Sequence, residues 1–211
     1  MRVRNKPYHR LLNFLTPVCF LLFVILFFYG ASLYPGGSYR YPLNEGYDMV
    51  NNYICNLMGT TALNGSPNPG RTISIVSWVA LGTGVGFFFY HQSSSFQLSR
   101  TLQKIIRLSG VLSMVFILLM FTVWHDTVLS ISGIIGSFSI ATLLVSLWKE
   151  KKLYLFFFGV ISLILLMYNA LSYFTFFHIE TLPLIQKITL ICMMLWFLIL
   201  NVHYTKKQTS A

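Results

Sequence analysis

The sequence predicts an all-α integral membrane protein, a bundle of six transmembrane helices with a short amphipathic helix in the first outer loop. Three observations lead to this fold class. The 211 residues are 55% hydrophobic and only 9% charged, whereas a soluble domain usually carries about 25% charged residues. The apolar residues gather into six long runs. Lys and Arg concentrate in alternate segments between the runs, as expected of a chain that crosses a bilayer repeatedly.

Each apolar run has a length that suits a membrane-spanning helix. The runs are 17 to 23 residues long, which at a rise of 1.5 Å per residue matches a hydrocarbon core of about 30 Å. Backbone groups in lipid must be hydrogen-bonded within their own segment, so runs of this length are predicted to be helices. They leave no room for a soluble domain, so residues 1–211 form one membrane domain, with residues 203–211 expected to be a mobile tail. The predicted spans are 11–33, 72–90, 108–124, 127–148, 153–171 and 182–202.

Basic and acidic residues sort to opposite sides of the predicted membrane. With the N-terminus in the cytoplasm, the cytoplasmic segments carry 12 of the 15 Lys and Arg residues and one acid, Glu150. The outer segments carry three basic residues and four acids. This distribution satisfies the positive-inside rule, so we expect a multi-pass protein of the plasma or inner membrane with both termini in the cytoplasm. The net charge of +10 then indicates topology and attraction to anionic lipid head groups, and nucleic acid is not needed to explain it.

The first outer loop, residues 34–71, is the one connection long enough to hold structure of its own. Turn-forming Gly, Pro and Asn residues gather at both ends, in 34–37 and 64–70. Between them the spacing predicts an amphipathic helix over 45–58, with apolar residues on one face and Asp48, Asn52 and Asn56 on another. Gly59 is well placed to end this helix. Two interpretations stay open, a lid fixed by Tyr and Met side chains or the wall of a polar pocket.

The motifs of this loop resemble those of a known family. They are Tyr34-Pro35-Gly36-Gly37, then 52–59 (Asn-Tyr-Ile-Cys-Asn-Leu-Met-Gly), then Pro67-Asn68-Pro69, all after a first membrane span. Together they resemble a prokaryotic family of six-transmembrane-helix proteins whose function is unknown. There is also a distant likeness to the DRAM-like six-span membrane proteins, in helix number and in the first outer loop. The resemblance implies the six-helix architecture and no particular activity.

Polar residues of the outer segments supply the candidate ligand-binding residues. The first loop contributes several of them, and the turn between the third and fourth runs contributes a His-Asp pair. Carboxylate and imidazole groups together can hold a divalent cation, although the spacing does not confirm a site. The alternative is that these residues only cap helices at the interface. The candidates are Asp48, Asn52, Asn56, Arg71, His125, Asp126, Asn169, His178, Glu180 and Lys187, of which His125, Asp126 and His178 are the weak candidates for a metal. No cofactor is predicted.

Lys187 is the candidate that lies deepest, about one turn into the last run. One interpretation is that it snorkels to the outer interface. The other is that it pairs with Glu180 or Asp126 and binds an anionic head group, in which case Asn169 could join the same cluster. Polar groups within a membrane usually face the interior of the bundle.

Small residues spaced four apart predict close helix contacts. The pattern occurs in the second and fourth runs, where it lets helix backbones approach each other in lipid. Whether the contacts are within one chain or between subunits stays open, and a homo-oligomer or a membrane-protein partner would use them in the second case. The residues concerned are Gly82, Gly86, Gly133, Gly136 and Ser137.

Several functions are compatible with this pattern. The first is a binding protein with a polar pocket on its outer face that takes a lipid head group or a small polar ligand. The second is a membrane-embedded lipid hydrolase or transferase, against which stands the lack of a G-x-S-x-G nucleophile motif. The third is a structural partner subunit. A transporter is less favoured, since no ionisable residue lies near mid-membrane.

Overall fold

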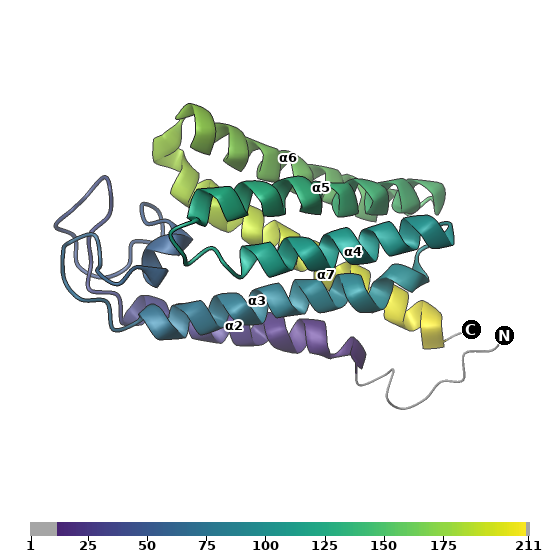
Figure 1. Ribbon diagram of the computed structural model, residues 1–211, viewed down its shortest axis with the longest axis horizontal. Helices are drawn as coiled ribbons and strands as arrows, with labels where there is room; N and C mark the ends of the chain where they lie inside the picture. The colour runs from purple at the N-terminus through teal and green to yellow at the C-terminus, as the bar shows by residue number, and fades with distance from the viewer. Residues whose placement is uncertain (1–11, 210–211) are drawn as a thin grey trace.

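The computed structural model describes the backbone of residues 12–209 and the side chains of residues 12–206, and it shows a bundle of long helices (Figure 1). Consecutive helices run antiparallel and pack side by side. The first loop gathers at one end, which we call the loop end. The opposite end carries Arg100, Lys149 and Lys206 and is called the basic end. The helices are α2 (Leu15–Ser32), α3 (Arg71–Gln92), α4 (Arg100–Ile117), α5 (His125–Lys149), α6 (Leu153–Thr175) and α7 (Leu182–Thr209).

Five of these helices are long and apolar enough to cross a membrane, namely α2, α3, α5, α6 and α7. The remaining helix, α4, carries Arg100, Lys104 and Arg107 in its first half, which lowers its mean hydropathy. Within the described residues the only β pairing is two isolated bridges in the first loop. The described part of the chain is therefore an all-helical bundle, and its five long apolar helices indicate a membrane protein, as the composition predicts.

The third predicted span is displaced along the chain. It was expected at 108–124, but α4 begins at Arg100 and ends at Ile117. Ser99 caps the new start by accepting a hydrogen bond from the Leu102 N–H, and the basic residues that follow are good helix formers. Residues 118–124 form turns instead of helix. The last helix is also longer than the predicted span, because α7 continues to Thr209 through most of the expected tail.

The prediction of an amphipathic helix over 45–58 is wrong except for one short turn. Only η1 (Ile54–Met58), a single 3-10 segment, is helical there. The Asp48 carboxylate accepts hydrogen bonds from the Val50 and Asn51 N–H groups at 2.8 and 3.1 Å. Such side-chain acceptors compete with the helical pattern and favour turns. Gly46, with φ of +69°, adds a backbone conformation that no helix contains.

Aromatic side chains and glycines build the core between α2, α3 and α7. Phe88, Phe89 and Phe197 are almost fully buried, with ring centroids 4.9 to 5.6 Å apart. A Cβ at Gly110 would lie 2.2 Å from the Phe89 ring, and one at Gly159 would lie 2.3 Å from Trp196. These glycines let α4 and α6 approach bulky rings on their neighbours.

The predicted small-residue contacts divide into internal and open positions. Gly82 and Gly86 face α4, where an added Cβ would meet Leu118 and Met114. Gly136 faces Ser113, also within the chain. By contrast, a Cβ at Gly133 would meet nothing within 4 Å. The Ser137 hydroxyl donates to the carbonyl of Gly133 in its own helix.

Polar side chains join three helices at the basic end. The Gln92 amide donates to the side-chain oxygens of Asn13 and Asn201 at 3.3 and 3.1 Å. The Asn201 amide donates in turn to the backbone carbonyl of Asn13 at 2.9 Å. All three side chains are buried, so this network fixes the start of α2 against α3 and α7.

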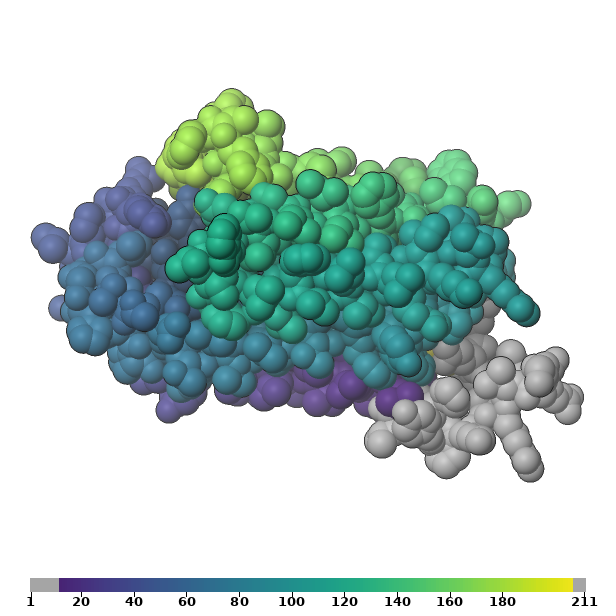
Figure 2. Space-filling model, viewed as in Figure 1, coloured from purple at the N-terminus to yellow at the C-terminus, as the bar shows by residue number. Residues whose placement is uncertain are grey.

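The first loop covers the loop end of the elongated molecule (Figure 2). Its own bridges, Gly36 with Glu45 and Thr61 with Pro67, fold it back on itself. Gly37 has φ of +84°, and a Cβ there would lie 2.3 Å from the Asn64 N–H nitrogen. The Tyr34-Pro35-Gly36-Gly37 motif therefore places glycine where another residue would collide with the loop.

Candidate functional site

Lys187 lies in the second turn of α7, where the first loop closes over the bundle. Its side chain is only 7% exposed. The ammonium donates to the backbone carbonyl of Pro183 at 2.9 Å and to that of Asn52. It also lies 5.4 Å from the centre of the Tyr47 ring. Among the described residues, no carboxylate oxygen lies within 4 Å of it, so Lys187 neither snorkels freely nor pairs with Glu180 or Asp126.

Asn52 organises the polar groups around this lysine. The residue is 0% exposed. Its amide donates to the Gly37 carbonyl at 2.7 Å and to the Asn56 side-chain oxygen at 3.4 Å, and its own oxygen accepts from the Asp48 N–H at 2.8 Å. A buried amide with these partners fixes the loop segment whose carbonyl receives Lys187.

The neighbouring acid, Asp48, is stabilised in its charged form. Partial burial raises the pKa of its carboxyl group. Hydrogen bonds from the Asn51 side chain and from the Val50 and Asn51 N–H groups outweigh that effect, so the pKa lies below its ordinary value of 3.8. Lys187 is near enough to lower the same pKa further. The cluster therefore contains a negative group near a buried cation, without a direct ion pair.

Two other polar residues attach the loop to α3. The Asn68 amide donates to the carbonyls of Leu57 and Gly59 at 2.9 and 3.0 Å, and its oxygen accepts from the Gly70 N–H. The guanidinium of Arg71 donates to the Met58 carbonyl at 3.2 Å. Arg71 is thus used in binding η1 to α3. From the sequence, Asn68 is expected only to form a turn. Its position between Pro67 and Pro69 is the one sequence feature that could have indicated a structural role.

His125 and Asp126 form a separate pair at the start of α5. The His125 Nδ1 atom lies 2.8 Å from the Asp126 carboxylate, which also accepts a 2.6 Å hydrogen bond from the Tyr173 hydroxyl. The pair therefore connects α5 with the part of α6 at the loop end. The Asp126 side chain is 65% exposed, and it lines neither the cavity beside Lys187 nor the one at the basic end of α7.

The remaining candidates do not join this cluster. His178 is exposed and stacks on Phe177, with ring centroids 4.1 Å apart. Glu180 is exposed at the short segment η3 (Ile179–Thr181). Asn169 donates to the Thr189 hydroxyl at 2.6 Å, between α6 and α7. Among the described residues no three His, Cys, Asp or Glu side chains are placed to hold a metal ion.

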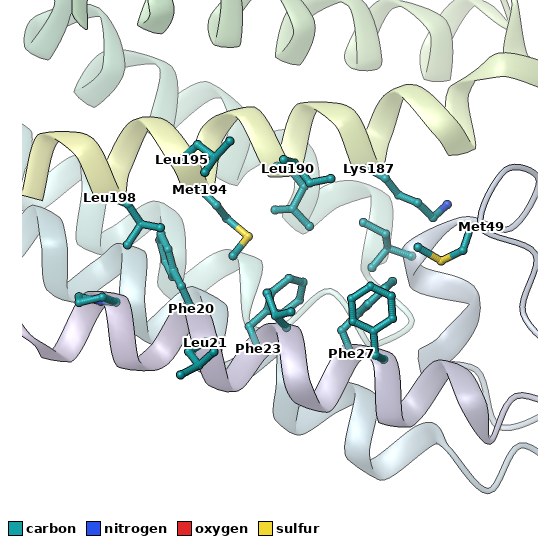
Figure 3. A pocket seen from close by; sticks show the side chains of 15 residues that line it. Phe20, Leu21, Phe23, Phe27, Met49, Lys187, Leu190, Met194, Leu195 and Leu198 are labelled. Carbon is teal, nitrogen blue, oxygen red and sulfur yellow. The ribbon is translucent and has the colours of Figure 1, made fainter.

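The cavity beside Lys187 is apolar and lies between α2 and α7 (Figure 3). It has a volume of about 410 Å³. Phe20, Phe23 and Phe27 line its α2 side, and Lys187 stands at its loop end beside Met49. We call this cavity the α2–α7 groove. The polar pocket expected from the sequence is thus filled by the protein's own hydrogen bonds, and the open space beside it is hydrocarbon-like. The α7 side of the groove consists of Leu190, Ile191, Met194, Leu195 and Leu198.

The sequence pattern did not reveal the α2–α7 groove. Every groove residue except Lys187 belongs to an apolar class that the same runs use for packing and for contact with lipid. Comparison with known proteins adds no assignment, since no family model, no curated protein and no solved structure matches the chain.

Proposed function

We propose that this chain is a lipid-binding membrane protein that receives an acyl chain in the α2–α7 groove and the anionic group of the same lipid at Lys187. The single observation that carries the proposal is the position of a buried ammonium at the end of an apolar cavity. The protein belongs, on this proposal, to the plasma or inner membrane and crosses it six times. Its termini lie in the cytoplasm, and the loop end faces outward.

The six-span topology rests on α4 and on the charges. The helix α4 packs antiparallel between α3 and α5 (Figure 1), so a membrane that contains its neighbours also contains it. Its three basic residues lie in the first half of the helix, where long side chains reach the interface. Lys and Arg favour the cytoplasmic side, which places the basic end inside. The resemblance to the six-helix family of unknown function is consistent with this arrangement.

The dimensions of the groove suit one acyl chain. A volume of 410 Å³ lies within the range of about 300–1,000 Å³ for small-molecule sites. The α7 wall runs from Lys187 to Leu198, a length of roughly 16 Å at the helical rise. That length is about half of a 30 Å hydrocarbon core. The groove therefore spans one leaflet, the one next to the loop end.

The lysine supplies the selectivity for an anion. An ammonium has three donors, and Lys187 uses two of them on backbone carbonyls. These neutral acceptors satisfy hydrogen bonds but do not cancel the positive charge. A cation in an apolar environment gains most from a negative partner that is excluded from water with it. A lipid carboxylate or phosphate in the groove would supply that partner.

The test is to fill the groove and to quantify lipid that purifies with the protein. Ile191→Trp places a bulky ring in the groove, and Ile164→Trp is the matched control. Both isoleucines are more than half exposed, at 56% and 61%, but Ile164 on α6 does not line the groove. Mass spectrometry of extracted lipid is expected to show a loss of about one lipid per protein in Ile191→Trp only. Equal lipid content in both variants would contradict the proposal.

A second variant separates the charge from the shape of the groove. Lys187→Gln keeps donors for the two carbonyls and removes the positive charge. Since one basic group near a membrane surface contributes about 1 kcal/mol toward anionic lipid, we expect the preference for anionic over zwitterionic lipid to fall about fivefold. Total lipid content should stay near the wild-type value. An unchanged preference would show that Lys187 does not contact the lipid head group.

A further inference from the structure

A second cavity lies at the basic end of α7, on the other side from the first loop. It has a volume of about 360 Å³ and lies between the start of α6 and the end of α7. Its walls differ from those of the α2–α7 groove, because α6 takes the place of α2. Leu198 is the one residue that lines both cavities. We call it the basic-end pocket, and its lining residues are Tyr154, Leu198, Ile199, Val202, His203 and Lys206.

The lining changes from polar to apolar along the helix axis. On the polar side, the Tyr154 hydroxyl lies 3.4 Å from the His203 Nδ1 atom. Lys206 follows His203 by three residues, a spacing that places both side chains on one helix face. Deeper in the membrane the wall is formed by Ile199 and Leu198. A phospholipid has the same order of chemistry, with a charged phosphate followed by hydrocarbon.

Positive charge dominates the surroundings of the basic-end pocket. Lys151 and Lys152 occupy the turn that leads into α6, three and two residues before Tyr154 respectively. The one acid of this end, Glu150, does not line the pocket. Its carboxylate accepts hydrogen bonds from the Tyr204 hydroxyl, the Ser146 hydroxyl and the Gln97 N–H. These hydrogen bonds connect the carboxylate to α5, to α7 and to the connection between α3 and α4.

We propose that the basic-end pocket is a separate site for an anionic phospholipid, whose phosphate contacts Tyr154, His203 and Lys206 and whose acyl chain lies along Ile199 and Leu198. Basic pockets between transmembrane helices on the cytoplasmic side are suited to such head groups. The site does not depend on the α2–α7 groove. Only its assignment to the inner leaflet rests on the orientation proposed above.

The experiment titrates the full chain in mild detergent with phosphatidylglycerol and follows the melting temperature. Phosphatidylcholine with the same acyl chains is the zwitterionic comparison. Lys206→Gln removes one charge from the pocket, and Lys104→Gln removes one from α4 at the same end. Both lysines are exposed, so neither variant should unfold the protein. The melting temperature of each variant without lipid checks this point.

The proposal predicts that phosphatidylglycerol raises the melting temperature and that phosphatidylcholine does so much less. The apparent affinity for phosphatidylglycerol should fall about fivefold in Lys206→Gln, the effect of one basic group near anionic lipid. It should be unchanged in Lys104→Gln, and Tyr154→Phe should weaken it in the same direction as Lys206→Gln. Because the α2–α7 groove is itself proposed to take an anionic lipid, Lys206→Gln is also measured in the Ile191→Trp background, where that groove is filled. The fivefold loss should persist there, so that failure of one site can be told from failure of the other.

Three results would overturn the proposal. The first is equal affinity of Lys206→Gln and the wild type. The second is an equal loss in Lys104→Gln, which would indicate general surface charge. The third is an equal rise of the melting temperature with inorganic phosphate, which would identify a site for a free anion instead of a lipid.

Discussion

Replacement of Asn52 by alanine tests whether buried hydrogen bonds fix the first loop over Lys187. The side chain is 0% exposed and serves two backbone groups, the Gly37 carbonyl at 2.7 Å and the Asp48 N–H at 2.8 Å. Alanine leaves both groups without their partner. A buried polar group that loses its partner costs about 1–3 kcal/mol, so the free energy of unfolding should fall by about 2–5 kcal/mol.

The matched control is Asn64→Ala in the same loop. The Asn64 side chain is exposed and accepts one hydrogen bond, from the Ser66 N–H at 3.0 Å. Water can replace that bond, so the loss should stay near 0.5 kcal/mol, as for other surface substitutions. The assay is thermal unfolding in one detergent, where 1 kcal/mol corresponds to roughly 2–4 °C for a chain of this size.

We therefore expect the melting temperature of Asn52→Ala to fall by about 4–20 °C and that of Asn64→Ala by about 2 °C or less. Lipid content in the α2–α7 groove should fall with the first variant, because the carbonyl that receives Lys187 is then no longer fixed. Equal melting temperatures of the two variants would refute the reasoning. Such a result would mean that the Asn52 side chain is replaced by water at no cost.

Three further predictions concern other parts of the chain. Gly110→Ala should lower the free energy of unfolding by about 1–3 kcal/mol, because its Cβ would lie 2.2 Å from Phe89. Gly133→Ala is the control and should not lower it, because a Cβ there meets nothing within 4 Å. Thermal unfolding of both variants tests this difference, and equal melting temperatures would contradict it. Since the folded pKa of Asp48 lies below 3.8, its stabilising contribution is complete above that value and is lost as pH falls through the folded pKa. The melting temperature should thus drop as the pH is lowered below about 4, and less so in Asp48→Asn. Burial raises the pKa of Cys55 to about 11, so its alkylation by maleimide at pH 7.5 should be slow until detergent denatures the protein; rapid labelling of the folded protein would contradict this.

The helices could be predicted from the sequence because lipid imposes one simple requirement. Long apolar runs have to satisfy their backbone hydrogen bonds internally, and five such helices appear in the structure. Their ends were less predictable. The helix α4 continues through Arg100 and Lys104, since a helix can extend beyond the hydrocarbon wherever its side chains reach water.

The first loop was harder to predict, because its structure depends on individual hydrogen bonds. Apolar residues recur over 45–58 at helical spacing, yet the Asp48 carboxylate and the Asn52 amide bind backbone groups and fold the segment into turns. Lys187 could be singled out from the sequence as an unusual residue. Its partners are the backbone carbonyl of Asn52 in a distant loop and that of Pro183 in its own helix, and no residue type in the sequence indicates them.

The most direct test of lipid binding in the α2–α7 groove uses a phospholipid with a photoreactive group in its acyl chain, reconstituted with the full chain in vesicles. Labelled peptides are then identified by mass spectrometry. Binding in the groove predicts labelling concentrated in 17–28 of α2 and 187–198 of α7, and its loss in Ile191→Trp. Labelling spread evenly over the exposed faces of all helices, such as Ile164 on α6, and unchanged in that variant, would contradict the account.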